Sequence, residues 1–182
     1  MEGSPGWVRA WQARGVAEDV TRRLIVLRHA KSDWPDDVPD HDRPLAKRGR
    51  KDAPAVGRWL RGSGYLPDTV ICSTARRTRE TWELVAGKLD ASPAVTFEPR
   101  AYAASALTLL YLARELPAGC RTALLIGHNP GVSDLASSLA GTSRGKLSFP
   151  TAGVAVLDFG GAWPDLAPDG ARLAAFVRPA DM

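Results

Sequence analysis

Short apolar segments alternate with segments of helical periodicity along most of this 182-residue chain, and this alternation constrains its fold more than any other feature. Apolar, partly β-branched runs predict strands, at residues 24–27, 69–72, 95–97, 122–126, 154–159 and 172–177. Apolar residues at helical spacing predict helices between them, at residues 45–60, 76–89, 103–116 and 130–140. Pro130 is expected at the first helical position of the last helix. Strands that alternate with helices predict an α/β sheet with parallel strands and right-handed crossovers.

The composition is typical of one globular domain. With 45% hydrophobic and 24% charged residues, the chain has no apolar run near the ~18 residues that a membrane span needs. We expect an N-terminal extension at residues 1–20 and one domain at residues 21–182. Two cysteines make no disulfide framework and no secretory signal pattern is present, which favours the cytoplasm. The net charge of +4 is too small to indicate a nucleic-acid partner, and no membrane partner is expected.

Histidines and arginines follow three of the predicted strands. Arg28 and His29 come directly after the first strand, Arg77 lies in the first turn of the helix after the second, and His128 follows the fourth. Parallel strands end at the same edge of a sheet, where α/β proteins place their sites, so we expect these side chains to converge. Two arginines can balance phosphoryl oxygens, while one imidazole attacks phosphorus and the other hydrogen-bonds the oxygens. The pattern predicts phosphoryl chemistry that requires no metal and no cofactor.

The motifs at these positions resemble those of the histidine phosphatase superfamily, which has the phosphoglycerate-mutase-like fold. The run Arg-His-Ala-Lys-Ser-Asp-Trp at residues 28–34 is similar to the SixA-type branch, the phosphohistidine phosphatases. Further matches follow in order, covering roughly residues 22–178: Asp42-Arg-Pro-Leu45, Gly49, Ser73 with Arg77 and Thr81, and Gly127-His-Asn-Pro-Gly131. The resemblance implies a single-domain three-layer α/β/α sandwich with a mostly parallel central sheet.

The resemblance also implies roles for individual residues. His29 would be the nucleophile that becomes phosphorylated, and the substrate would be held by residues at one sheet edge: Arg28, Ser32, Arg77, His128 and Asn129. It implies a metal-independent phosphatase that acts through a phosphohistidine intermediate. The chain is short and leaves little room for the enclosing loops of mutases, which favours an open site and a phosphorylated protein as substrate over a small phosphorylated molecule.

The sequence does not decide which residue acts as the general acid. Glu98 follows the third predicted strand, where larger mutase-like members carry a glutamate, and Asp33 in the first loop is the rival. We interpret the acidic loop around Asp33 as solvated, because its prolines interrupt any regular spacing of metal ligands. The spacing between Cys72 and Arg77 weakly resembles that of the cysteine and arginine in thiol phosphatases. Cys72 lies inside an apolar strand, however, where a cysteine usually packs as a small hydrophobic residue.

Two other functions stay open. The first is a small-molecule phosphomonoesterase or phosphoglycerate-mutase-like enzyme of the same fold. The second is a basic binding module that uses residues 43–51 and 76–79, although the first of these clusters lacks the interleaved aromatic residues that stack on bases. The sequence does not indicate the oligomeric state.

Overall fold

A computed structural model describes residues 21–142 and 147–182, so the predicted extension at residues 1–20 lies outside the described residues. Its strands are β1 (Arg22–Arg28), β2 (Thr69–Ser73), β3 (Ala94–Glu98), β4 (Thr122–Gly127), β5 (Val154–Phe159) and β6 (Arg172–Val177). Its α-helices are α1 (Lys47–Gly62), α2 (Arg76–Leu89), α3 (Ala106–Arg114) and α4 (Gly131–Leu139). Two short 3-10 helices matter for the site, η1 (Asp40–Asp42) and η2 (Pro99–Ala101).

The strands form one sheet in the order β3-β2-β4-β1-β5-β6. Strands β1 to β4 pair in parallel, whereas β5 is antiparallel to β1 and β6 is antiparallel to β5. The reversal arises because the chain returns after α4 to the carboxyl end of β1, where the backbone N–H of Ala152 donates to the Arg28 carbonyl (3.1 Å), before β5 begins. The mostly parallel α/β fold predicted from the sequence is confirmed.

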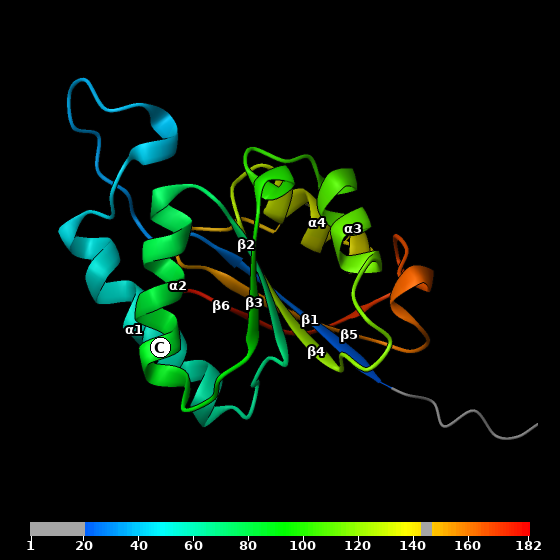
Figure 1. Cartoon of the computed structure of the whole chain (residues 1–182). Helices are drawn as coiled ribbons and strands as arrows, with labels where there is room; N and C mark the ends of the chain where they lie inside the picture. Colours follow the sequence, from blue (N-terminus) through cyan, green and yellow to red (C-terminus); the bar gives the residue numbers. More distant parts are fainter. Residues whose placement is uncertain (1–20, 143–146) are drawn as a thin grey trace, which may run out of the picture.

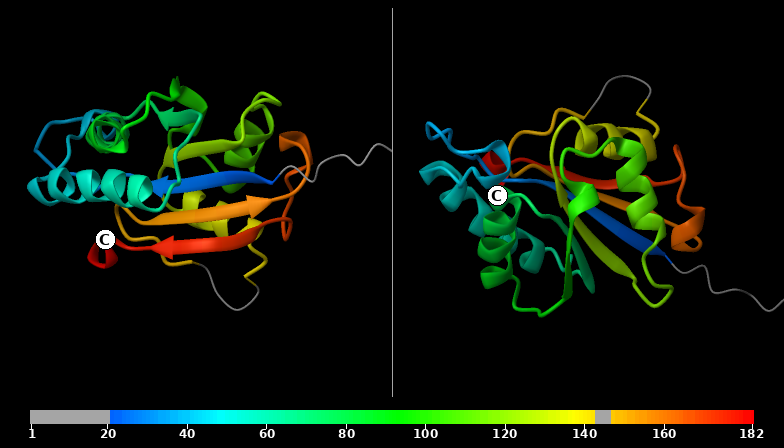
Figure 2. Two further views of the ribbon diagram at one scale, coloured as in Figure 1. Left: turned by 90° about the horizontal axis from the view of Figure 1, so that it is seen from below. Right: turned by 45° about the horizontal axis from the view of Figure 1, so that its top comes forward.

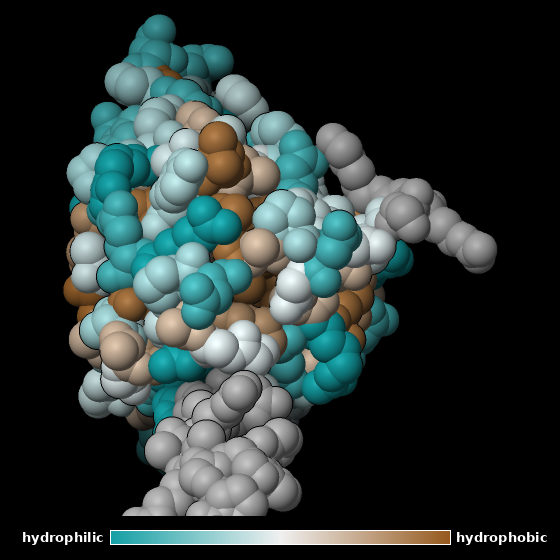
Figure 3. All heavy atoms as spheres, turned by 90° about the vertical axis from the view of Figure 1, so that its right-hand side faces the viewer, coloured by the Kyte–Doolittle hydropathy of each residue, from teal (hydrophilic) through white to brown (hydrophobic). Residues whose placement is uncertain are grey.

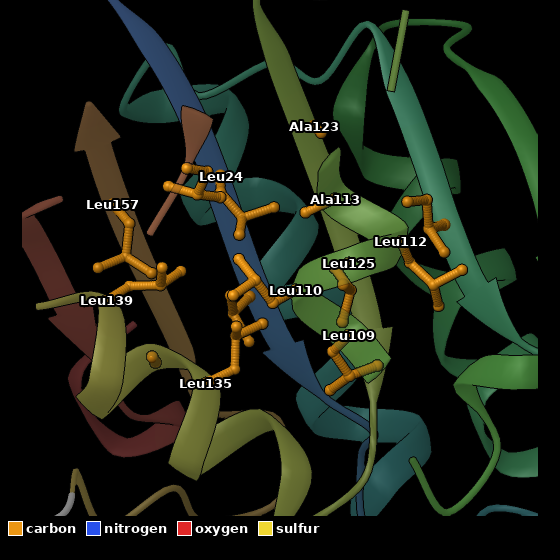
Figure 4. Close-up of a cluster of buried hydrophobic side chains, with 14 of the residues drawn as sticks. Leu24, Leu109, Leu110, Leu112, Ala113, Ala123, Leu125, Leu135, Leu139 and Leu157 are labelled. Carbon is orange, nitrogen blue, oxygen red and sulfur yellow. The ribbon is translucent and has the colours of Figure 1, made fainter. Parts of the chain in front are cut away.

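Helices cover both faces of the sheet, with α1 and α2 packed together over one face and α3 and α4 over the other (Figures 1 and 2). Leu24 and Val26 of β1 enter the core under α3 and α4, whereas Ile25 and Leu27 enter the core under α1 and α2. Figure 4 shows leucines of α3 and α4 meeting those of β1, β4 and β5. A strand buried on both faces explains the unbroken apolar run at the start of the domain.

Three helices begin later than the sequence pattern predicts. Helix α1 starts at Lys47 rather than at residue 45. Helix α3 starts after Ser105, because the Ser105 side chain accepts a backbone hydrogen bond and caps the helix there. Pro130 is the N-cap of α4 rather than its first helical residue, so that prediction was wrong by one position. The first residue of α4, Gly131, packs against the loop before α3, where a Cβ would collide with the carbonyl oxygen of Ala104.

The loop between β1 and α1 projects past the carboxyl edge of the sheet (Figure 1, blue to cyan). Its base is fixed by a β-bridge between Ser32 and Leu45 and by a hydrogen bond from the Ala46 N–H to the Lys31 carbonyl (2.9 Å). Gly49 lets α1 lie against this base, because a Cβ there would collide with the same carbonyl oxygen. The two ends of this loop are therefore held together where it joins the rest of the domain.

Figure 3 looks onto the side that lies at the right of Figure 1, and it shows hydrophobic residues in small areas separated by hydrophilic ones. Within the part of the chain that the structure describes, no helix combines the length and the apolar character needed to cross a membrane.

Candidate active site

The two histidines meet because β1 and β4 are neighbours in register. Arg28 pairs with Gly127, so the next residue of each strand is a histidine at the same edge of the sheet. The His29 N–H donates to the Gly127 carbonyl (3.1 Å), which continues the ladder by one bond. The ring centroids of His29 and His128 are 5.2 Å apart, and both residues are buried.

Hydrogen bonding assigns the protons of His29. Its Nδ1 lies 2.8 Å from the carbonyl oxygen of Ala30, which can only accept, so Nδ1 carries the hydrogen. The lone pair is then on Nε2, which has no hydrogen-bond partner among the described residues. Burial lowers the pKa of His29 to about 3, and the charges of Arg77 and Arg28 act in the same direction. The ring is therefore neutral at physiological pH, with a free nitrogen.

The second ring is held at both nitrogens. Nη2 of Arg77 donates to Nδ1 of His128 (3.2 Å), so Nε2 carries the proton and donates to the hydroxyl of Ser73 (2.8 Å). Ser73 ends β2, the strand next to β4, and is fully buried. Burial and the charge of Arg77 lower the pKa of His128 to about 4. This ring is likewise neutral and fixed in orientation.

Arg77 is shared between the histidine and a carboxylate of the projecting loop. It donates from Nη1 to the Asp40 carbonyl (2.5 Å) and from Nη2 to the Asp40 carboxylate (3.0 Å). The same carboxylate accepts from Arg43 (2.9 Å) and from the Tyr102 hydroxyl (2.7 Å). The hydrogen bonds from Tyr102, Arg43 and Arg77 hold the pKa of Asp40 well below its usual range. Asp40 is thus an ionised group that orients two buried guanidinium groups.

A second arginine approaches from the end of β1. Nη1 of Arg28 donates to the carbonyl of Phe149 (2.8 Å), and the amide of Asn129 donates to the same oxygen (3.1 Å). Burial lowers the pKa of Arg28, with no carboxylate among the causes of that shift. The Nε atoms of Arg28 and Arg77 are buried without a hydrogen-bond partner among the described residues. Two such guanidinium groups beside two neutral imidazoles create a positive field that favours an anion.

The two histidines and the arginines around them line one cavity of about 260 Å³ at the carboxyl edge of the sheet. Its lining includes the expected nucleophile, His29, and all five residues expected to bind substrate. The complete lining is Arg28, His29, Lys31, Ser32, Trp34, Arg43, Arg77, His128, Asn129 and Thr151. Ser32 contributes indirectly, because its hydroxyl accepts from Nη2 of Arg43 (2.6 Å). Helix α2 is tied to this cavity by Thr81, whose hydroxyl donates to the Arg77 carbonyl and accepts from the Ala30 N–H.

Glu98 is not brought into this cavity. Its carboxylate accepts from the backbone and side chain of Arg100 (2.9 to 3.1 Å), which is also paired with Glu115. These three residues line a different cavity of about 330 Å³ between β3 and α3. The hydrogen bonds from Arg100 lower the pKa of Glu98. Its placement argues against the role of acid or base at His29, and we propose no such role for it.

The sequence reasoning missed Asp40, Arg43 and Tyr102 as parts of this site. Asp40 was one of several loop aspartates, and nothing in the local pattern shows that η1 turns it toward Arg77. Arg43 starts the basic cluster considered for a binding module, whereas the structure buries it. The one usable signal was its place in the family motif before α1. Cys72 lies in the core as predicted, and burial raises the pKa of its thiol to about 12.

Sequence comparisons agree with this geometry. Residues 24–100 match the family model of the histidine phosphatase superfamily (branch 1). An uncharacterized protein of Mycobacterium tuberculosis is 41% identical over 161 residues, which is 84% of this chain and 99% of that protein. An uncharacterized chloroplastic protein of Arabidopsis thaliana is 35% identical over 182 residues, covering 92% of this chain and 82% of its own length.

Comparison with solved structures indicates the branch of this superfamily. The "putative phosphohistidine phosphatase SixA" of Nakamurella multipartitia matches with a TM-score of 0.77 and 34% identity, over 87% of this chain and 96% of that one. Its counterpart from Agrobacterium tumefaciens matches with a TM-score of 0.73 and 28% identity, over 87% and 98%. The chain therefore belongs to the histidine phosphatase superfamily (branch 1), in its SixA-type branch, which confirms the resemblance found in its motifs.

Proposed function

We propose that this protein is a metal-independent phosphatase that forms a phosphohistidine on His29 and acts on phosphohistidine in proteins. The observation that carries the proposal is the hydrogen bond between Nδ1 of His29 and the Ala30 carbonyl, because it leaves a lone pair on Nε2 in a cavity lined by three arginines, Arg28, Arg43 and Arg77. A neutral imidazole with one nitrogen so fixed is an activated nucleophile that needs no further base.

In the first step, Nε2 of His29 attacks phosphorus while the bond from phosphorus to the leaving group breaks. Arg28 and Arg77 balance the charge of the phosphoryl oxygens, and His128 holds Arg77 by accepting a hydrogen bond from its Nη2. The arginines are set before substrate binds, so the site does not have to reorganise as charge moves between oxygens.

In the second step, water attacks phosphorus, the bond to Nε2 of His29 breaks, and orthophosphate leaves. His29 regains its lone pair because Nδ1 has kept its proton on the Ala30 carbonyl throughout. The same residues thus serve both halves of the cycle.

The nature of the leaving group supports phosphohistidine as substrate. Departure of an alkoxide from an ester requires a proton donor, whereas an imidazole whose other ring nitrogen already carries a proton leaves as a neutral molecule. The carboxylate bonded to the site arginines, Asp40, is held ionised, and Glu98 is engaged by Arg100. A cytoplasmic location, as the cysteine usage favours, remains a prediction.

The test is a substrate panel with a labelling experiment. Activity is measured, with and without EDTA, on a phosphohistidine protein, phosphoramidate, a phenyl phosphate and a sugar phosphate. Phosphohistidine should give kcat/KM at least about tenfold above the sugar phosphate, and EDTA should change nothing. Rapid quenching should trap a phosphoenzyme that is labile in acid and stable in base.

The matched control uses the third histidine. His41 lies near the site, where its Nε2 is 3.0 Å from the Thr74 hydroxyl, but it has no place in the proposed chemistry. His41→Ala should still be labelled, whereas His29→Ala should not. A His29→Ala protein with wild-type turnover would contradict the mechanism. If the enzyme prefers the sugar phosphate, the substrate is a small-molecule phosphate ester and not phosphohistidine. Inhibition by EDTA that a divalent ion reverses would require a metal.

A further inference from the structure

Trp34 has an unusual position for a large aromatic residue. Its side chain is 71% exposed, yet it lines the same cavity as His29. A solvent-exposed indole contributes little to folding, because most of its apolar surface stays in water. Packing of the loop therefore does not account for this residue, and a role in binding does.

The indole is exposed but not free to move. The guanidinium carbon of Arg43 lies 3.1 Å from the centroid of the Trp34 ring, so one face of the indole is covered. Arg43 is itself buried and donates to the Asp33 carbonyl (2.9 Å), to Asp40 (2.9 Å) and to Ser32 (2.6 Å). A fixed cation thus supports one face of an exposed ring. The structure leaves the other face available to a ligand.

In-line displacement determines which part of the substrate reaches this ring. His29 is buried at the inner end of the cavity, so the phosphoryl group lies above Nε2 and the leaving group points away from it toward solvent. Trp34 stands at that outer end. In phosphohistidine the leaving group is a flat aromatic ring, which stacks well on an indole face.

We propose that Trp34 is a stacking platform for the leaving imidazole and thereby selects phosphohistidine over substrates without a ring. This inference rests on the proposed function and adds a specificity-determining residue to it. Stacking helps most when it also holds the ring during bond breaking, so the effect is expected in kcat/KM for substrates with a ring and not for those without.

The test compares two small substrates with the same bond. Phosphoimidazole and phosphoramidate both contain a P–N bond, but only the first has an aromatic leaving group. Trp34→Leu should lower kcat/KM for phosphoimidazole by about tenfold and leave phosphoramidate within about twofold. Trp34→Phe should recover most of the loss, because it restores a flat ring. Tyr111→Leu is the matched control, since Tyr111 is 52% exposed on α3 and lines no part of this cavity.

Each outcome decides between the two proposals. Equal losses on both substrates, or no loss on either, overturn the platform while the phosphatase function stands. A loss confined to a phosphohistidine protein, with phosphoimidazole unaffected, shows that Trp34 contacts the protein surface and also overturns it. A wild-type enzyme that hydrolyses sugar phosphates but neither P–N substrate refutes the proposed function, and the platform with it.

Discussion

Removing the hydroxyl of Ser73 should disable His128 without touching the substrate. Ser73 is fully buried, and its Oγ lies 2.8 Å from Nε2 of His128. In Ser73→Ala the imidazole N–H is left buried without a partner, which costs about 1–3 kcal/mol of folding free energy. Moving the proton to Nδ1 does not help, because that nitrogen faces an N–H of Arg77 (3.2 Å). The ring can recover this energy only by turning, which breaks the hydrogen bond that its Nδ1 accepts from Arg77.

We expect kcat to fall by about 10–100-fold, equivalent to about 1.4–2.7 kcal/mol of transition-state stabilisation, with a smaller change in KM. Steady-state kinetics and thermal unfolding measure both effects. Ser137→Ala is the matched control, because Ser137 of α4 is also buried and its Oγ accepts a hydrogen bond from the Leu147 N–H (2.8 Å) rather than from His128. A Ser73→Ala enzyme with wild-type kcat, or one whose loss matches that of Ser137→Ala, refutes the role of the hydroxyl.

Three further predictions concern charge and protonation. Arg77→Lys should lower kcat by about 10²–10³-fold, because an ammonium keeps the charge but cannot reach Asp40 and His128 together; near-normal turnover would show that charge alone suffices. NMR titration should find His29 and His128 neutral down to about pH 4, and a titration midpoint near pH 6.5 would contradict the effect of burial on their pKa values. Because these pKa values are lower in the folded protein than in the unfolded chain, the folding stability measured by thermal melts should decline as pH falls from 6.5 through 4 to 3. Glu98→Gln should keep kcat/KM for phosphohistidine within about twofold, and a large loss would place its carboxylate in the reaction.

The parallel arrangement of the strands, which the sequence predicted, accounts for most of what could be foreseen of the site. Arg28 ends β1, and His29 and His128 directly follow β1 and β4. Parallel strands end at one edge of the sheet, so the convergence of these residues required only the α/β pattern. The same rule misled at Glu98. It located the end of β3 correctly but not the direction of the carboxylate, which Arg100 two residues later holds through its backbone and side chain.

Loop residues were beyond that reasoning. Asp40 lies in η1, where no periodicity shows which side chain points inward, and its hydrogen bonds to Arg77 and Tyr102 join segments far apart in the chain. Helix starts failed for a related reason. The apolar pattern already begins at residue 103, before the first residue of α3. The helix starts later because the Ser105 side chain accepts a backbone hydrogen bond and caps it there.

The protonation of the site limits which bonds it can break. Asp40, the carboxylate in contact with the cavity's arginines among the described residues, is held ionised by three donors, and both histidines in the cavity are neutral. None of these groups is a strong acid in the resting enzyme, so an ester oxygen must leave largely without a proton. The rate should therefore depend strongly on the leaving group. Across substituted phenyl phosphates, kcat/KM should rise by at least about tenfold from phenyl to 4-nitrophenyl phosphate. A flat dependence would show that a proton donor assists departure, and the argument for phosphohistidine would lose its chemical basis. A steep dependence in both the wild type and Glu98→Gln would show that departure proceeds without an acid from the enzyme, which suits the imidazole of phosphohistidine when its other ring nitrogen already carries a proton.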